Sequence, residues 1–181
     1  LFPSHFIKTL DPPTNYVGAS RVFAPDGDLR QKMVRIVEDY QDTLPLNHKK
    51  DRELSELPPS IYEAIRVFVL VRAIRILRDD GAKHCSMMIN VSRFNDIQDK
   101  VHGLVYAYQK QLDDAIKLHA GLGEKGLKDP DLASLKATFL KEFAEIEFNF
   151  EEVQSALPEA SASIVVRTVN MRGGTLDYEA N

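Results

Sequence analysis

The residues with the clearest chemical potential lie between His84 and Gln98. An apolar run of strand length, 86–92, ends in Ser92 and is followed by Arg93, and open α/β sheets hold their ligands at the carboxyl ends of buried strands. An arginine there can bind a phosphate through two parallel hydrogen bonds, and the amino end of the next helix favours an anion. Ser92 and Arg93 are therefore the candidate nucleotide or phosphate contacts. The structural alternative is that Ser92 caps the helix and Arg93 pairs with an acid.

Three arginines at steps of three, Arg72, Arg75 and Arg78, form a second candidate site on one side of an expected helix. Such a stripe can follow a nucleic-acid backbone. The structural alternative is that they pair with the acidic residues that follow or with another helix. His84 can touch a substrate, although a lone histidine before a strand is more often hydrogen-bonded locally.

The sequence lacks several motifs that would complete an active site. It has no glycine-rich phosphate loop that ends in Gly-Lys-Ser/Thr, and no His-Glu-x-x-His motif. Gly121, Gly123 and Gly126 lie between two expected helices, which is the wrong context for a phosphate cradle. The acidic pairs are typical of a solvated surface rather than of a metal-binding nuclease. We therefore expect neither a complete nucleotide-hydrolysing or nuclease site nor a metal site in this chain.

Composition narrows the class of protein. The chain has 181 residues, of which 44% are hydrophobic and 28% charged, as in an ordinary globular domain with a real core. A net charge of -4 argues against an overall electrostatic attraction to nucleic acid, so any contact with DNA would depend on particular arginines. The single cysteine, Cys85, excludes an internal disulfide and fits a reducing cytoplasm. No apolar run is long enough to span a membrane.

Three helices are predicted to form the body. The first covers 61–77, is apolar on nearly every face, and is entered through Ser60 as N-cap with Glu63 completing a capping box. The second is amphipathic and runs from Asn95 or Asp96 to about His119, and the third covers roughly 131–148.

Two apolar runs, 86–92 and 164–170, predict buried strands, and the residues around 158–161 predict a turn. A helical crossover between two buried strands favours a right-handed parallel unit. The expected fold class is therefore α/β, helix-rich, with a small parallel sheet.

The N-terminal third is expected to differ from the rest. Residues 1–57 are punctuated by prolines and glycines and predict an irregular segment with a short helix within 29–39 and a polar loop over 46–57. The domain proper is expected over 58–181. Because the chain starts without Met and without a signal-like segment, we expect a piece of a longer cytoplasmic protein.

The stretch His84–Gln98, in which a histidine and Ser-Met precede a short apolar run ending in Ser-Arg-Phe with a glutamine further on, resembles a family described as endonucleases with a Z-one (Z1) domain. The flanking pieces occur in the same order and are individually weaker: Leu1-Phe2-Pro3, Leu57-Pro58-Pro59-Ser60 and Leu176-Asp177-Tyr178.

The resemblance implies a large bacterial parent, similar to superfamily-two helicases with two RecA-like lobes, that acts in DNA restriction or repair. It implies that 86–92 and 164–170 are strands of the second lobe and that the other helices are insertions. ATP and Mg²⁺ are expected for the parent and no cofactor for this chain. DNA and the rest of the parent are the expected partners. Ser92 and Arg93 would face the cleft between lobes, with His84 and Gln98 as secondary candidates.

Two functions follow as hypotheses. The first is a part of a helicase-like, DNA-processing ATPase or endonuclease, inactive by itself, that contacts DNA. The second is a non-enzymatic helical module that docks a partner protein. An exposed apolar stripe on the helix over 97–112 would favour the second, and salt-sensitive DNA binding would favour the first.

Overall fold

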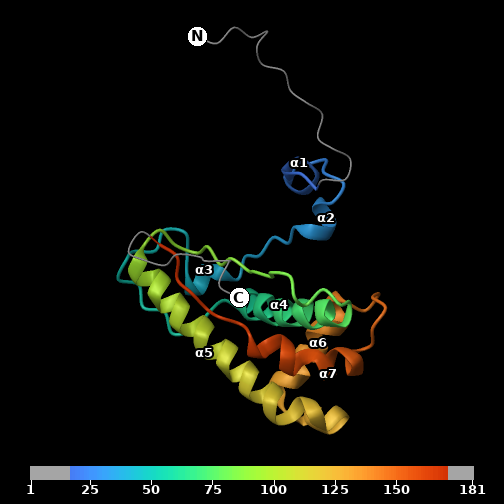
Figure 1. Cartoon of the computed structure of the whole chain (residues 1–181). Helices are drawn as coiled ribbons and strands as arrows, with labels where there is room; N and C mark the ends of the chain where they lie inside the picture. Colours follow the sequence, from blue (N-terminus) through green and yellow to red (C-terminus); the bar gives the residue numbers. More distant parts are fainter. Residues whose placement is uncertain (1–16, 171–181) are drawn as a thin grey trace. The chain divides into compact units, whose positions relative to one another are not determined.

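The computed structural model describes residues 17–170 (Figure 1). They form two compact units, one up to Glu38 and the other from Asp39 onward. The N-terminal unit holds two short helices, α1 (Ala19–Phe23) and α2 (Arg30–Met33). The helix expected within 29–39 is therefore only one turn long.

The N-terminal unit is organised by polar contacts. Arg21 donates two hydrogen bonds to the Asp28 carboxylate, at 3.0 and 2.6 Å. The turn between the helices requires glycine at Gly27, because a Cβ there would lie 2.4 Å from the Arg21 carbonyl oxygen. None of its described residues is buried, so residues 17–38 form no apolar core of their own.

The C-terminal unit is helical. After α3 (Tyr40–Thr43) it contains α4 (Pro59–Leu77), α5 (Asn95–His119), the 3-10 segment η2 (Ala120–Lys128), α6 (Pro130–Glu142) and α7 (Phe150–Ala162). Helices α4, α6 and α7 lie side by side and α5 crosses them at an angle (Figure 1). Their shared core includes ten side chains that are almost completely buried: Leu57, Leu70, Ile97, Leu112, Ile116, Leu132, Leu135, Leu157, Val69 and Val153.

Helix α4 confirms the prediction over 61–77, but its amino end differs from the expected capping box. Pro59 occupies the first turn, where its missing N–H costs nothing. The Ser60 N–H and hydroxyl both donate to the Asp39 carboxylate, at 2.7 and 2.8 Å. An acid from 21 residues earlier thus satisfies the start of the helix, where the helix dipole favours negative charge.

Helix α5 confirms the prediction from Asn95 to His119. The helix expected over 131–148 ends earlier, at Glu142, and a helix that was not predicted, α7, follows it. Helix α7 begins with a complete capping box, in which the Asn149 side chain accepts from the Glu152 N–H and the Glu152 carboxylate accepts from the Asn149 N–H. Pro158, expected in a turn, lies inside α7 on its exposed side.

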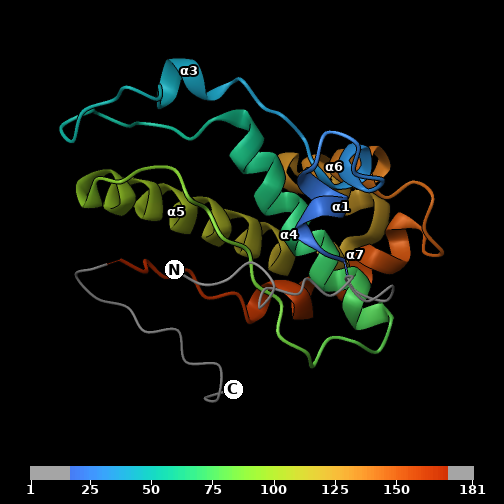
Figure 2. The same ribbon diagram turned by 90° about the horizontal axis from the view of Figure 1, so that it is seen from above.

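The predicted parallel sheet is wrong, because residues 17–170 contain no β-strand. The stretches 86–91 and 164–169 do run as extended chain (Figure 2), without pairing into a sheet. Ile89, Val91, Ile164 and Val166 pack on the helical core, while Val165 and Val169 are exposed. The apolar residues of these runs that are covered pack on helices rather than within a sheet. The predicted likeness to part of a RecA-like lobe depended on this sheet and is therefore wrong as well.

Candidate functional site

The predicted contact Ser92 lies in a turn just before α5, where it meets a histidine from the α3–α4 loop. The His48 Nε2 atom is 2.8 Å from Ser92 Oγ, and His48 Nδ1 is 2.8 Å from the Pro45 carbonyl oxygen. A carbonyl oxygen only accepts, so Nδ1 carries a proton, and in the neutral ring Nε2 accepts the Ser92 hydroxyl proton. Ser92 Oγ also accepts the Phe94 N–H at 3.1 Å. Ser92 is thus fixed on two sides.

His48 and Ser92 belong to the two walls of a pocket of about 450 Å³. One wall is the loop 44–48 and the other is the turn 91–94. The lining residues are Leu44, Leu46, Asn47, His48, Val91, Ser92, Arg93 and Phe94. We call this cavity the Ser92 pocket. Leu44 forms part of the buried core, whereas the Leu46 side chain is 86% exposed.

Arg93 is the charged residue of the Ser92 pocket. Its guanidinium lies 4.9 Å from the centre of the Phe94 ring. The His48 and Phe94 rings make a T-shaped contact, with their centres 5.8 Å apart. Among residues 17–170, Arg93 has no hydrogen-bond or ion-pair partner, and neither has the Asn47 side chain. The predicted alternative, in which Arg93 pairs with an acid, is not found in this part of the chain.

Gln98 fixes the backbone of the turn that contains Ser92. Its side-chain N–H donates to the Ser92 carbonyl oxygen at 2.8 Å, and its Oε1 accepts from Asn170 at 3.1 Å. Gln98 does not line the pocket. It holds the backbone of the turn and ties that turn to the extended segment 164–170.

The three arginines of α4 have partners within the protein. Arg72 donates to the Ala160 carbonyl oxygen at 2.9 Å and to the Ser163 hydroxyl, near the end of α7. Arg75 binds Asp80 at 3.0 Å and the carbonyl oxygens of residues 80, 83 and 84. Arg78 donates twice to Glu147, at 2.6 and 2.7 Å. These contacts correspond to the structural alternative for the stripe.

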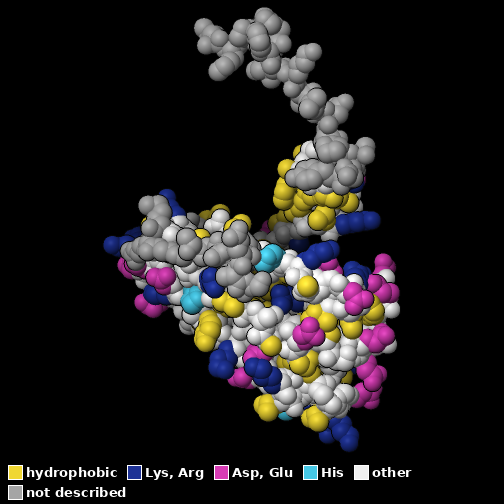
Figure 3. All heavy atoms as spheres, in the orientation of Figure 1, with side chains coloured by type: hydrophobic (Ala, Val, Ile, Leu, Met, Phe, Trp, Pro, Cys, Tyr) yellow, Lys and Arg dark blue, Asp and Glu magenta, His cyan; other side chains and the backbone are white. Residues whose placement is uncertain are grey.

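The distribution of charge on the surface agrees with this pairing of the arginines. On the face shown in Figure 3, basic and acidic side chains are interspersed over the helices, and no continuous basic stripe is visible.

The Arg78 guanidinium lowers the pKa of the Glu147 carboxyl to about 2. The pKa of Arg75 is raised, first by a hydrogen bond with the Cys85 thiol and then by the charge of Asp80.

His84 lies outside the Ser92 pocket. Its side chain is exposed, and its carbonyl oxygen accepts from Arg75 at 3.1 Å. The structure therefore brings Ser92, Arg93 and Gln98 together but not His84. His48 was missed by sequence reasoning, because nothing local in the polar loop 46–57 distinguishes a histidine that closes a contact 44 residues away.

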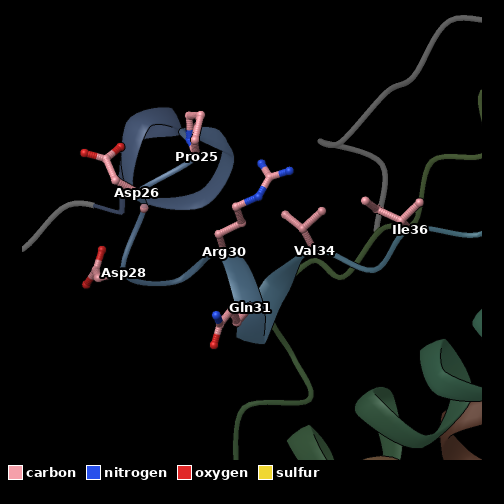
Figure 4. Close-up of a pocket in the computed structure, with 8 residues that line it drawn as sticks. Pro25, Asp26, Asp28, Arg30, Gln31, Val34 and Ile36 are labelled. Carbon is pink, nitrogen blue, oxygen red and sulfur yellow. The ribbon is translucent and has the colours of Figure 1, made fainter.

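A second pocket, of about 540 Å³, lies in the N-terminal unit between Pro25 and Ile36. Its charged residues do not converge on one point: the Asp26 and Asp28 carboxylates point away from the Arg30 guanidinium (Figure 4). Arg30 donates to the Phe23 carbonyl oxygen at 2.7 Å, and Asp28 is paired with Arg21. This pocket has the polar groups of a folded turn rather than those of a binding site.

Helix α5 shows no apolar stripe that would mark a docking face over 97–112. Over 97–112 its large apolar side chains are buried or partly buried, apart from the half-exposed Tyr106. Leu118, near the end of the helix, is also exposed. Within residues 17–170, no three His, Cys, Asp or Glu side chains are placed to hold a metal ion. No described helix is both long enough and apolar enough to cross a membrane.

Comparison with known proteins identifies a family. The model of the Z1 domain matches residues 60–181, about two thirds of the chain. The match includes α4 and the turn with Ser92 and Arg93, whereas Leu44 to His48 of the pocket precede it. No curated protein and no solved structure matches the chain. The chain belongs to the Z1 domain family.

Proposed function

We propose that this Z1 domain contacts the phosphates of DNA through Arg93, within a helicase-like protein that processes DNA. The observation that carries the proposal is the Arg93 guanidinium, which lies beside the Ser92 pocket and has no hydrogen-bond or ion-pair partner among the described residues. The arginines of α4, in contrast, are occupied by acids and carbonyl oxygens.

Arginine suits this role because its planar guanidinium donates two parallel hydrogen bonds to a phosphate. Its present neighbour, the Phe94 ring, holds it by a cation–π contact of about 1 kcal/mol or less at an exposed site. That contact is weak enough to be exchanged for a phosphate. Ser92 does not bind the phosphate in this proposal. Its hydroxyl is hydrogen-bonded to His48 and to the Phe94 N–H, and these bonds order the turn that carries Arg93.

With a net charge of -4, the domain is expected to bind DNA through few contacts. Each phosphate contact adds about 0.9 to the slope of log affinity against log salt for duplex DNA, and about 0.7 for single strands. Removing Arg93 should therefore reduce that slope by about one and weaken binding across sequences.

The test is DNA binding by the full chain across a salt series, with Arg93→Ala compared with Lys125→Ala. Lys125 is exposed in η2, at the other end of α5 from the pocket, and the 25 residues of α5 span about 37 Å. Both variants remove one positive charge. We expect only Arg93→Ala to lower the affinity and the slope. Equal binding by Arg93→Ala and wild type would reject the proposal.

The family resemblance also implies ATPase and endonuclease activities. Those activities would belong to the larger protein. For this domain we propose recognition of DNA alone.

A further inference from the structure

We infer that the Ser92 pocket receives one unpaired nucleotide of DNA, with its base between the pocket walls and its phosphate on Arg93. This inference rests on the proposed function and adds the kind of DNA that is recognised. It also gives a role to Leu46 and Asn47, which neither the sequence motifs nor the family match includes.

The size and walls of the pocket fit a base. Its volume of about 450 Å³ lies in the range of about 300–1,000 Å³ that small-ligand sites occupy. Leu44, Val91 and Phe94 provide an apolar lining, and a base offers two apolar faces to such a surface. Leu46 stands 86% exposed at the pocket, where it can cover a base that enters.

The polar groups of the pocket fit the rest of a nucleotide. The Asn47 amide offers both donors and an acceptor, which are the groups that read the edge of an unstacked base. It has no hydrogen-bond partner among the described residues, and the same holds for Arg93. One neutral amide and one guanidinium around an apolar cavity match a base and its phosphate, respectively. A paired base presents neither face, because both are stacked in the duplex.

Hydrogen bonds fix the walls of the pocket before any ligand binds. The hydrogen bond between His48 and Ser92 joins its two walls, and Gln98 fixes the turn from below. A site formed in advance loses less conformational entropy on binding than one that must order its loops. The loop 44–48 can therefore recognise a nucleotide although it contains no helix or strand.

The experiment compares three DNA ligands of the same sequence with the full chain: a single strand, a duplex with one bulged nucleotide, and a fully paired duplex. The variants are Leu46→Ala and Asn47→Ala, both at exposed positions where folding is not at risk. We expect wild type to bind the bulged duplex and the single strand about tenfold more tightly than the paired duplex, as expected for one stacked base. Each variant should reduce that preference several-fold and leave binding to the paired duplex and the salt slope unchanged.

The outcomes separate the two proposals. Equal affinity for bulged and paired duplex, with Arg93→Ala still weakening both, would overturn the inference and leave the proposed function intact. A preference that survives in both pocket variants would overturn it as well. Deoxyadenosine monophosphate binding as tightly as the single strand would assign the pocket to a free nucleotide instead of DNA. Failure of wild type to bind any of the three DNA ligands at low salt would overturn both proposals.

Discussion

His48 and Ser92 come from segments 44 residues apart, and their hydrogen bond joins the two walls of the pocket. Each partner makes further contacts, so the strength of the pair is best measured by a double-mutant cycle. We expect His48→Ala and Ser92→Ala each to lower the free energy of unfolding by about 1 kcal/mol, with a coupling of about 0.5–1.5 kcal/mol. Urea unfolding of the two single variants and the double variant measures it.

His102 provides the control for that cycle, because its ring stacks on Tyr106 within α5 rather than on the pocket. His102→Ala combined with Ser92→Ala should be additive. A coupling between His48 and Ser92 no larger than this control would mean that the pair does not brace the pocket.

The Arg78–Glu147 ion pair should make the stability of the folded state depend on pH. The Glu147 pKa is lowered from 4.5 to about 2 by Arg78, so the pair stabilises the folded state fully above the unfolded pKa. That contribution is lost as the pH falls from about 4.5 through about 2. Glu147→Gln should melt slightly below wild type at pH 7, and the two should converge near pH 2. The side chains are half-exposed, so the difference should be small and shrink with added salt. A gap in melting temperature that persists near pH 2 would contradict this assignment.

At the scale of elements, α5 contains a glycine that its geometry does not require. Gly103 lies in the middle of the helix, and an added Cβ would meet nothing within 4 Å. Because glycine loses more backbone entropy than alanine on folding, Gly103→Ala should stabilise the protein by about 0.5–1 kcal/mol. Denaturant unfolding measures this.

Gly126 is the matched comparison for Gly103. A Cβ there would lie 2.2 Å from the His119 carbonyl oxygen, so Gly126→Ala should destabilise the protein instead. If Gly103→Ala were also destabilising, the exposed face of α5 would be in contact with something that the described residues do not include.

The helices that sequence reasoning identified, α4 and α5, carry long patterns whose signals all lie within the element. Sequence reasoning misses helix α7 because Pro158 indicates a turn, although Asn149 and Glu152 at the start of the helix form a recognisable capping box. The short apolar runs 86–92 and 164–170 predict buried strands. A run of this kind shows that its residues are apolar, but it does not show whether neighbouring strands or the surface of a helix will cover them. The same limit applies to the site: Ser92 and Arg93 were identifiable from local order, whereas His48 depends on a contact between distant segments.

At the scale of the whole molecule, the buried apolar residues within 17–170 all lie from Leu44 onward. The helices of the N-terminal unit contain no buried residue, and its described contacts are hydrogen bonds and one ion pair. Cooperative stability in a small protein comes mainly from buried apolar surface. The free energy of unfolding should therefore belong almost entirely to the C-terminal unit.

A chain that begins at Asp39 tests this division. It should unfold cooperatively in urea at the same midpoint as the full chain, because the core and the Ser92 pocket are retained. Asp39 itself must stay, since its carboxylate accepts both hydrogen bonds from Ser60 at the start of α4. Asp39→Ala in the shortened chain should cost about 1 kcal/mol, as the loss of a helix cap does. If the urea midpoint of the shortened chain were lower than that of the full chain, residues 1–38 would stabilise the helical unit through contacts beyond its own core.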